Sequence, residues 1–241
     1  MSRIILVHGA WHGGWCWEQL MPYLQAAGHD VWAPDLPGHG EDTTPINRVS
    51  LNRYVQSVAD IVTSVEDDPA LVVGHSMGGI VISQLAESCP EYIQRLIYLC
   101  AFLPANGETL AQINADDSSL LNNYKQVDRE ALSMKIDPDH TFEIFYQDCD
   151  PDTATQATAR LVDQPLAPLG TPLELSQERF GSVSKDGIVC RQDRALTPTL
   201  QRQMYSAGQC QQQFEIDSGH SPFYSMPQSL AELLLSRLAN G

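Results

Sequence analysis

The sequence predicts an α/β protein built on one mainly parallel, doubly wound sheet of about six strands. Short, wholly apolar segments alternate along the chain with longer segments whose apolar residues recur at helical spacing. This alternation is typical of parallel sheets, because the connection between two parallel strands usually contains a helix. The strand candidates are residues 4–7, 31–33, 71–74, 95–103, 187–190 and 213–216.

Three segments outside these strands have the apolar spacing of helices that cover a sheet. Residues 17–27 end at Gly28, a residue suited to a helix C-terminus. Residues 51–65 carry apolar side chains along one face, and the final helix is expected over residues 230–238. These helices complete the predicted layers on the two sides of the sheet.

The alternation breaks between residues 104 and 180, where prolines and acidic residues are frequent and no segment is a convincing strand. We expect a helical cap over residues 104–180, inserted into a core made of residues 1–103 and 181–241. Its candidate helices are 129–136, 138–147 and 151–162. Within the second of these, the aromatic residues Phe142, Phe145 and Tyr146 are expected mostly to pack in the core, with some lining a pocket.

Composition excludes several classes of protein. With 241 residues and 43% hydrophobic content, the chain can bury a large core as one domain. The net charge of −16 argues against nucleic-acid and anionic membrane partners, and no apolar run approaches the length of a membrane span. The six scattered cysteines are expected to be reduced, so the protein is expected to be cytoplasmic.

A Gly-x-Ser-x-Gly sequence at Gly74, Ser76 and Gly78 joins an apolar strand to an apolar helix. Such a turn places a serine on a sharp corner with its hydroxyl exposed, and the glycines avoid collisions across the tight backbone. Ser76 is therefore the candidate nucleophile. The amide of Met77, which opens the helix, is expected to form half of an oxyanion hole.

A glycine-rich loop at residues 8–15 follows the first strand. In hydrolases with this type of serine turn, such a loop offers a second backbone amide to the oxyanion, here most plausibly that of Ala10. Gly9 would allow a close approach to substrate. We expect His8 and His12 to have structural roles and not to bind a metal, because the loop lacks the helical spacing of a zinc-binding histidine pair.

Two further candidates lie just after predicted strands. Asp193 follows the strand at 187–190, and His220 follows the strand at 213–216. Together with Ser76 they have the chain order serine, aspartate, histidine. Asp217 is a rival acid, but it shares a loop with His220, and a separate strand end suits the third member better.

With these motifs the chain resembles α/β-hydrolases of the group that contains plant methylesterases, hydroxynitrile lyases and bacterial pyrethroid-hydrolase-like carboxylesterases. The resemblance covers essentially the whole chain and implies the α/β-hydrolase fold. Lyases of that group resemble one another in carrying threonine at the position of Gly9 and lysine at that of Ser221. Because both are absent here, the resemblance implies ester hydrolysis, with no metal or organic cofactor.

We therefore expect a serine carboxylesterase that acts on small hydrophobic or aromatic esters, such as methyl or pyrethroid-like esters, through an acyl-enzyme intermediate. A lactonase, a thioesterase, a polyketide cyclase or lyase, and a ligand receptor that kept the triad are the alternatives. A small-molecule ester is the expected partner, and a homodimer is possible. The expected substrate contacts are Gly9, Trp11, His75, Phe102 and Phe223.

Overall fold

The computed structural model describes residues 1–65 and 68–238. Its main sheet has the strand order β2-β1-β3-β4-β8-β9, and every neighbouring pair is parallel. This confirms the predicted doubly wound sheet. The strands are β1 (Arg3–Val7), β2 (Asp30–Trp32), β3 (Ala70–His75), β4 (Ile93–Leu99), β8 (Lys185–Cys190) and β9 (Gln212–Ile216).

Burial explains why the inner strands could be recognised in the sequence. Every residue of β1, β3 and β8 is buried, as expected for strands covered on both faces, whereas no residue of the edge strand β9 is. The register pairs Leu6 with Val73 and Gly74 with Tyr98. The carboxyl ends of the central strands therefore meet at one edge of the sheet.

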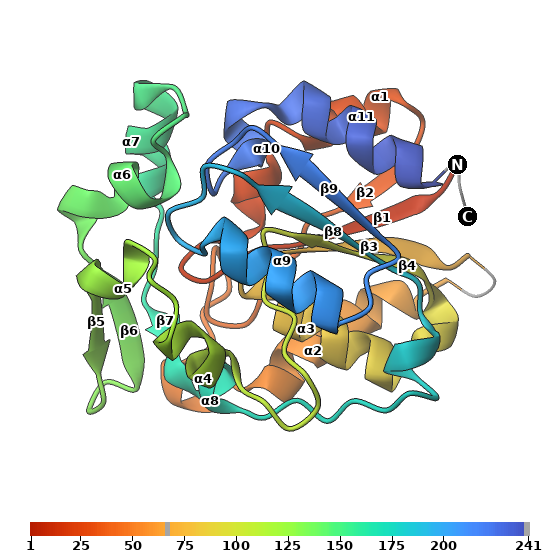
Figure 1. Ribbon diagram of the computed structural model, residues 1–241, viewed down its shortest axis with the longest axis horizontal. Helices are drawn as coiled ribbons and strands as arrows, with labels where there is room; N and C mark the ends of the chain where they lie inside the picture. The colour runs from red at the N-terminus through yellow and green to blue at the C-terminus, as the bar shows by residue number, and fades with distance from the viewer. Residues whose placement is uncertain (66–67, 239–241) are drawn as a thin grey trace.

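Helices cover both faces of this sheet (Figure 1). On one face lie α1 (Met21–Ala26) and α11 (Pro227–Leu238), which contact each other. On the other lie α2 (Leu51–Val62), α3 (Gly78–Ser88) and α9 (Pro198–Ala207). No helix in residues 1–65 and 68–238 is both long and apolar enough to cross a membrane.

Three predicted elements have different bounds in the structure, two of them for backbone reasons. The first helix was expected over 17–27, but a 3-10 helix, η1 (Gly14–Trp17), precedes α1, because Pro22 has no amide hydrogen for a continuous helix through this region. The strand expected over 95–103 ends at Leu99, because Cys100 adopts a φ of 36° and turns the chain. The helix expected over 51–65 ends at Val62.

The cap lies between β4 and β8 in sequence, at the side of the sheet toward which the arrowheads of β8 and β9 point (Figure 1). Its helices at 138–147 and 151–162 are confirmed with tighter bounds. The helices are α4 (Leu110–Ala115), α5 (Leu121–Tyr124), α6 (Thr141–Phe145), α7 (Pro151–Ala159) and α8 (Leu166–Gly170), with a 3-10 helix at Pro138–His140.

The expectation that the cap contains no strands was wrong. An antiparallel sheet in the order β5-β6-β7 is formed by β5 (Lys125–Asp128), β6 (Ser133–Ile136) and β7 (Gln164–Pro165). The predicted helix at 129–136 is thus a turn followed by β6. Met134 and Ile136 are buried while Lys135 is exposed. This alternation of buried and exposed residues is typical of a strand, but over so few residues it cannot be distinguished from helical spacing.

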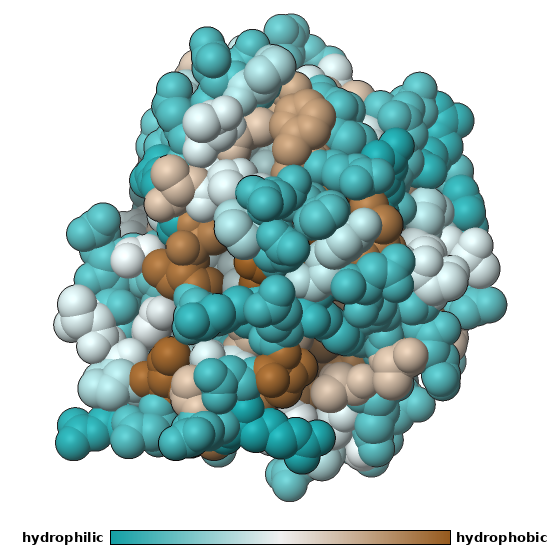
Figure 2. Space-filling view, turned by 90° about the vertical axis from the view of Figure 1, so that its left-hand side faces the viewer, coloured by the Kyte–Doolittle hydropathy of each residue, from teal (hydrophilic) through white to brown (hydrophobic). Residues whose placement is uncertain are grey.

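The outer surface of the cap carries exposed apolar side chains. Val127, Leu132 and Phe142 are 51%, 48% and 44% exposed, so Phe142 does not pack in the core as expected. Phe145 and Tyr146 are buried. Seen from the cap side, apolar residues form separate patches divided by hydrophilic ones (Figure 2).

Gly79 in α3 makes a close backbone contact that can be tested. A Cβ atom there would lie 2.0 Å from the carbonyl oxygen of Phe102, in the segment after β4. We expect Gly79→Ala to lower the free energy of unfolding by about 1–3 kcal/mol, because the two backbones must separate. Urea denaturation measures this change.

Gly170→Ala is the matched control, because no atom lies within 4 Å of the added Cβ. Its free energy of unfolding should stay within about 0.5 kcal/mol of the original. Equal effects of the two substitutions would contradict the packing argument.

Candidate active site

Ser76 lies on the corner between β3 and α3 with a left-handed φ of 53°. The two glycines of the motif are required by close contacts. A Cβ at Gly74 would lie 2.8 Å from the carbonyl oxygen of Gly78, and one at Gly78 would lie 2.7 Å from that of Val7. The local sequence thus forces the strand, sharp turn and helix that were predicted.

Backbone hydrogen bonds hold this corner against the end of β4. The amide of Ser76 donates to the carbonyl of Leu99 at 3.3 Å, and the amide of Phe102 donates to the carbonyl of Ser76 at 3.0 Å. Ser76 is 9% exposed. Its side chain is therefore presented from a fixed backbone.

Asp193 and His220 meet on the loops after the adjacent strands β8 and β9. The Nδ1 atom of His220 donates to Oδ2 of Asp193 at 2.8 Å, and both residues are buried. This leaves Nε2 of His220 as a hydrogen-bond acceptor. The rival Asp217 points elsewhere, since its largely exposed carboxylate lies 3.4 Å from the guanidinium of Arg191.

Gln201 of α9 is a site residue that sequence reasoning missed. Its Nε2 atom donates to Oδ2 of Asp193 at 2.9 Å, and its Oε1 atom accepts from the amide of Cys190 at 3.1 Å. The other carboxylate oxygen of Asp193 accepts from the amides of Ala195 and Leu196. The sequence feature that could have identified it is a glutamine on the buried face of an amphipathic helix, because a buried polar side chain needs a hydrogen-bond partner.

His8 orients the first peptide of the glycine-rich loop, as its expected structural role requires. Its Nδ1 atom donates to the carbonyl of Gly9 at 2.8 Å, and its Nε2 atom accepts from the amide of Leu36 at 3.0 Å. The Gly9 carbonyl and the Ala10 amide belong to one planar peptide group. His8 therefore sets the plane in which the Ala10 N–H lies.

His12 makes the equivalent contact one residue later. Its Nδ1 atom lies 2.8 Å from the carbonyl of Ala10, and its Nε2 atom lies 2.8 Å from the hydroxyl of Tyr146 in the cap. Burial lowers the pKa of His12 to about 4. The imidazole is thus neutral at pH 7, so Nδ1 donates to the carbonyl and Nε2 accepts from the tyrosine.

The remaining predicted residues surround the triad candidates. The Nε2 atom of His75 donates to the carbonyl of His220 at 2.9 Å, and the ring of Phe223 packs edge-on against His75 with ring centroids 5.0 Å apart. Phe102 is buried beside the serine corner. Trp11 is buried, and its indole N–H donates to the carbonyl of Met134 in the cap at 2.8 Å.

Gly9 lies directly against the serine corner. A Cβ at this position would lie 2.8 Å from Cβ of Ser76 and 2.9 Å from Nδ1 of His75. Both neighbours are near the backbone or in a buried ring, so neither gives way easily. A larger residue at this position would displace the serine.

A group of potential metal ligands lies at the same place. The ligand atoms of His75, Cys100 and His220 lie within 4.8 Å of one another. Each side chain already makes a hydrogen bond: His75 and Cys100 to the carbonyl of His220, and His220 to Asp193. Hydrogen bonding within the protein therefore accounts for the cluster.

The cap covers the triad candidates, and the ring centroid of Phe145 lies 5.7 Å from that of His220. A separate cavity of about 500 Å³ lies beside α9, and its lining includes Leu103, Phe180 and Met204 but none of Ser76, Asp193 and His220. We therefore assign the candidate chemistry to the covered strand ends and not to this cavity.

A parallel sheet that presents a serine, an imidazole and a carboxylate from the ends of three strands is the arrangement of a nucleophilic hydrolase. The sequence profile of the Alpha/beta hydrolase family matches residues 4–233. The chain therefore belongs to that family.

Three of its relatives are similar over most of their own length. The chain is 30% identical to methylesterase 7 of Arabidopsis thaliana, covering 97% of this chain and 95% of that protein. It is 32% identical to a pyrethroid hydrolase of Sphingobium wenxiniae, covering 97% and 86%. The crystal structure of a pyrethroid hydrolase from Sphingobium faniae matches with a TM-score of 0.87 at 30% identity, covering 100% and 98%. These similarities support an esterase function on this scaffold.

Buried neutral histidines make stability depend on pH. Burial lowers the pKa of four histidines in the folded protein: His8, His12, His39 and His75. As the pH falls, these side chains therefore gain a proton in the unfolded chain before they do so in the folded protein, and this favours unfolding. We expect stability to be highest above about pH 6.5 and to fall toward pH 4. His12 alone accounts for roughly 3 kcal/mol of this loss.

Urea unfolding at pH 7.5 and pH 4.5 measures the effect, and His12→Asn, which removes one such imidazole, should reduce the pH dependence. An unfolding free energy that is independent of pH over this range would contradict the prediction.

Proposed function

We propose that the chain is a serine carboxylesterase that hydrolyses small hydrophobic or aromatic esters, such as methyl or pyrethroid-like esters, through an acyl-enzyme intermediate. One observation carries the proposal. A serine with a φ of 53° stands on the corner between β3 and α3, and the imidazole of His220 is oriented by a 2.8 Å hydrogen bond to Asp193 on the neighbouring loop.

In this mechanism, Oγ of Ser76 attacks the ester carbonyl carbon while Nε2 of His220 takes the hydroxyl proton. Asp193 stabilises the resulting imidazolium and keeps Nδ1 protonated. Collapse of the tetrahedral intermediate breaks the bond to the leaving alcohol, which receives the proton from His220. Water, deprotonated by the same imidazole, then attacks the acyl-enzyme and releases the acid and the free serine.

The amides of Ala10 and Met77 are the proposed donors to the oxyanion. Met77 directly precedes the first residue of the 11-residue helix α3, so the positive end of the helix dipole adds to its effect. The Ala10 amide is oriented by the hydrogen bond from His8 to Gly9. A donor that is already oriented costs no reorganisation when the charge forms.

Two positions favour ester hydrolysis over lyase chemistry. The close contacts around Gly9 exclude the threonine that the resembling lyases carry there. Ser221, beside His220, is buried and uncharged, so it supplies no cation for a departing anion. Phe102, Phe145 and the neighbouring aromatic rings favour an apolar acyl or alcohol group.

Ser76→Ala tests the proposed nucleophile. We expect its turnover of p-nitrophenyl butyrate to fall by about 10³-fold or more, because no other group forms the acyl-enzyme. Ser83→Ala is the control, since this buried serine bonds to Gly79 and Tyr98 away from the proposed triad.

A fluorophosphonate probe should label the original protein and Ser83→Ala but not Ser76→Ala. Labelling of Ser76→Ala, or turnover by it, would overturn the assignment. A panel of methyl, aryl, lactone and thioester substrates then separates an esterase from the lactonase and thioesterase alternatives.

Gln201→Leu tests whether Asp193 depends on its buried partner. Loss of a hydrogen bond to a carboxylate should lower kcat by about 10- to 100-fold. Gln203→Leu, on the exposed face of the same helix, should retain full activity. Steady-state kinetics at pH 8 compare the two, and equal kcat values would contradict the role.

A further inference from the structure

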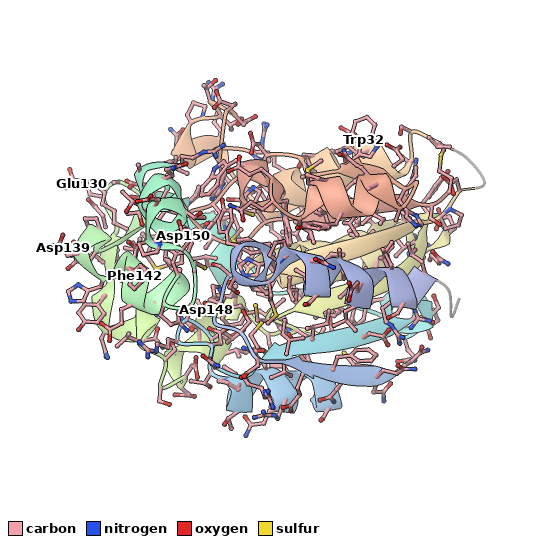
Figure 3. The ribbon with its side chains drawn as sticks, turned by 90° about the horizontal axis from the view of Figure 1, so that it is seen from above. Trp32, Glu130, Asp139, Phe142, Asp148 and Asp150 are labelled. Carbon is pink, nitrogen blue, oxygen red and sulfur yellow. The ribbon has the colours of Figure 1, made fainter. Side chains whose placement is uncertain are left out.

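One short segment of the cap contacts three of the loops that carry the proposed catalytic groups. Besides the bond from Tyr146 to His12, the side-chain Nε2 of Gln147 donates to the carbonyl of Gln192 at 2.8 Å, and Asp148 accepts from the backbone amide of Gly219 at 2.7 Å. Asp148 lies where the cap meets the core (Figure 3). Residues 146–148 therefore hold the loops of Ala10, Asp193 and His220 together.

The contact at Tyr146 leads directly to the proposed oxyanion hole. Because the carbonyl of Ala10 can only accept, Nδ1 of His12 carries the proton, and Nε2 accepts a hydrogen bond from the Tyr146 hydroxyl. Hydrogen bonds in such a chain polarise one another. The Ala10 carbonyl sets the tautomer of His12, and the tyrosine hydroxyl holds the far side of the ring, so that Nδ1 stays directed at Ala10.

Ala10 is held on both sides. His8 fixes the peptide that precedes it and His12 the peptide that follows it. The Ala10 N–H lies in the first of these planes, and only the two soft torsions of Ala10 join that plane to the second, so His12 restrains the N–H from the other side. Losing the bond from His12 therefore loosens the donor that His8 alone must then orient.

The next residue shows that the loop does not hold this conformation by local preference. Trp11 has a φ of 63°, which costs a bulky residue of the L series roughly 1–3 kcal/mol. Two cap contacts retain it: the amide of Val162 donates to the carbonyl of Trp11 at 3.0 Å, and the Trp11 indole donates to Met134. The cap therefore imposes the loop conformation.

We propose that Tyr146 is a positioning residue for the oxyanion hole, acting through His12 on the Ala10 amide, so that the cap sets the rate of the chemical step as well as covering the substrate. This inference rests on the proposed serine esterase function.

Tyr146→Phe is the decisive variant, because it removes one hydroxyl from a fully buried ring. We expect kcat to fall by about 10- to 100-fold while KM changes by less than about twofold, since the oxyanion exists only after attack. An aryl trifluoromethyl ketone, which forms a tetrahedral adduct with the serine, should bind more weakly by the same factor as kcat falls.

Tyr98→Phe is the matched control. Tyr98 is also fully buried, and its hydroxyl lies 2.8 Å from Oγ of Ser83, so the variant loses a comparable hydrogen bond outside the site. It should change thermal stability without changing kcat or the affinity for the trifluoromethyl ketone. A merely structural role for Tyr146 would give the same pattern as this control.

A double-mutant cycle with His12→Ala tests the route. If Tyr146 acts through His12, the double variant should be about as slow as His12→Ala alone, and additive losses would overturn the route. If the original protein turns over the ester and Tyr146→Phe has the same kcat and the same inhibitor affinity, this inference is overturned but the proposed function is not. Absence of turnover and of Ser76 labelling in the original protein would overturn the proposed function with it.

Discussion

The close approach of backbone segments around Ser76 is the constraint on which the rest of the structure depends. Gly74 and Gly78, two positions before and after the serine, cannot carry a side chain without meeting Gly78 or Val7, and the serine itself takes a left-handed φ. Such a corner is stable only when the strands on both sides are held in register. The parallel pairings of β3 with β1 and β4 supply that support.

The same sheet order brings the partners of the serine together. Asp193 and His220 follow β8 and β9, which are neighbours in the sheet although the cap separates them from β4 in sequence. Around them, buried histidines are each confined to one tautomer by what they contact. A carbonyl fixes the protonated nitrogen of His8, His12 and His75, and a carboxylate fixes that of His220. Protein groups, and not water, therefore determine which nitrogen of each of these four imidazoles donates a hydrogen bond.

The sequence predicted the features that depend on local pattern. Central strands buried on both faces appear as apolar runs, and Ser76 and Asp193 follow two of them, whereas His220 follows the exposed edge strand β9 and was found by its position after Ser76 and Asp193 in the chain. The cap sheet was missed because its strands have only two to four residues. Gln201 was not predicted to be a site residue, and Tyr146 was expected only to pack in the core or line a pocket, because their polar contacts are with residues far away in the sequence.

The contacts of residues 146–148 also bear on how caps diverge among related enzymes. A cap that only shielded the substrate could be exchanged between relatives at its two connections to the core. Here it also carries the groups that Gln192 and Gly219 require, so an exchanged cap must bring equivalent groups to the same three loops. Substitutions elsewhere on the cap surface, around the exposed Phe142, are free of this requirement (Figure 3). The outer cap surface can therefore accept substitutions without disturbing the loops that carry the proposed catalytic groups, whereas changes in residues 146–148 alter contacts to three of them.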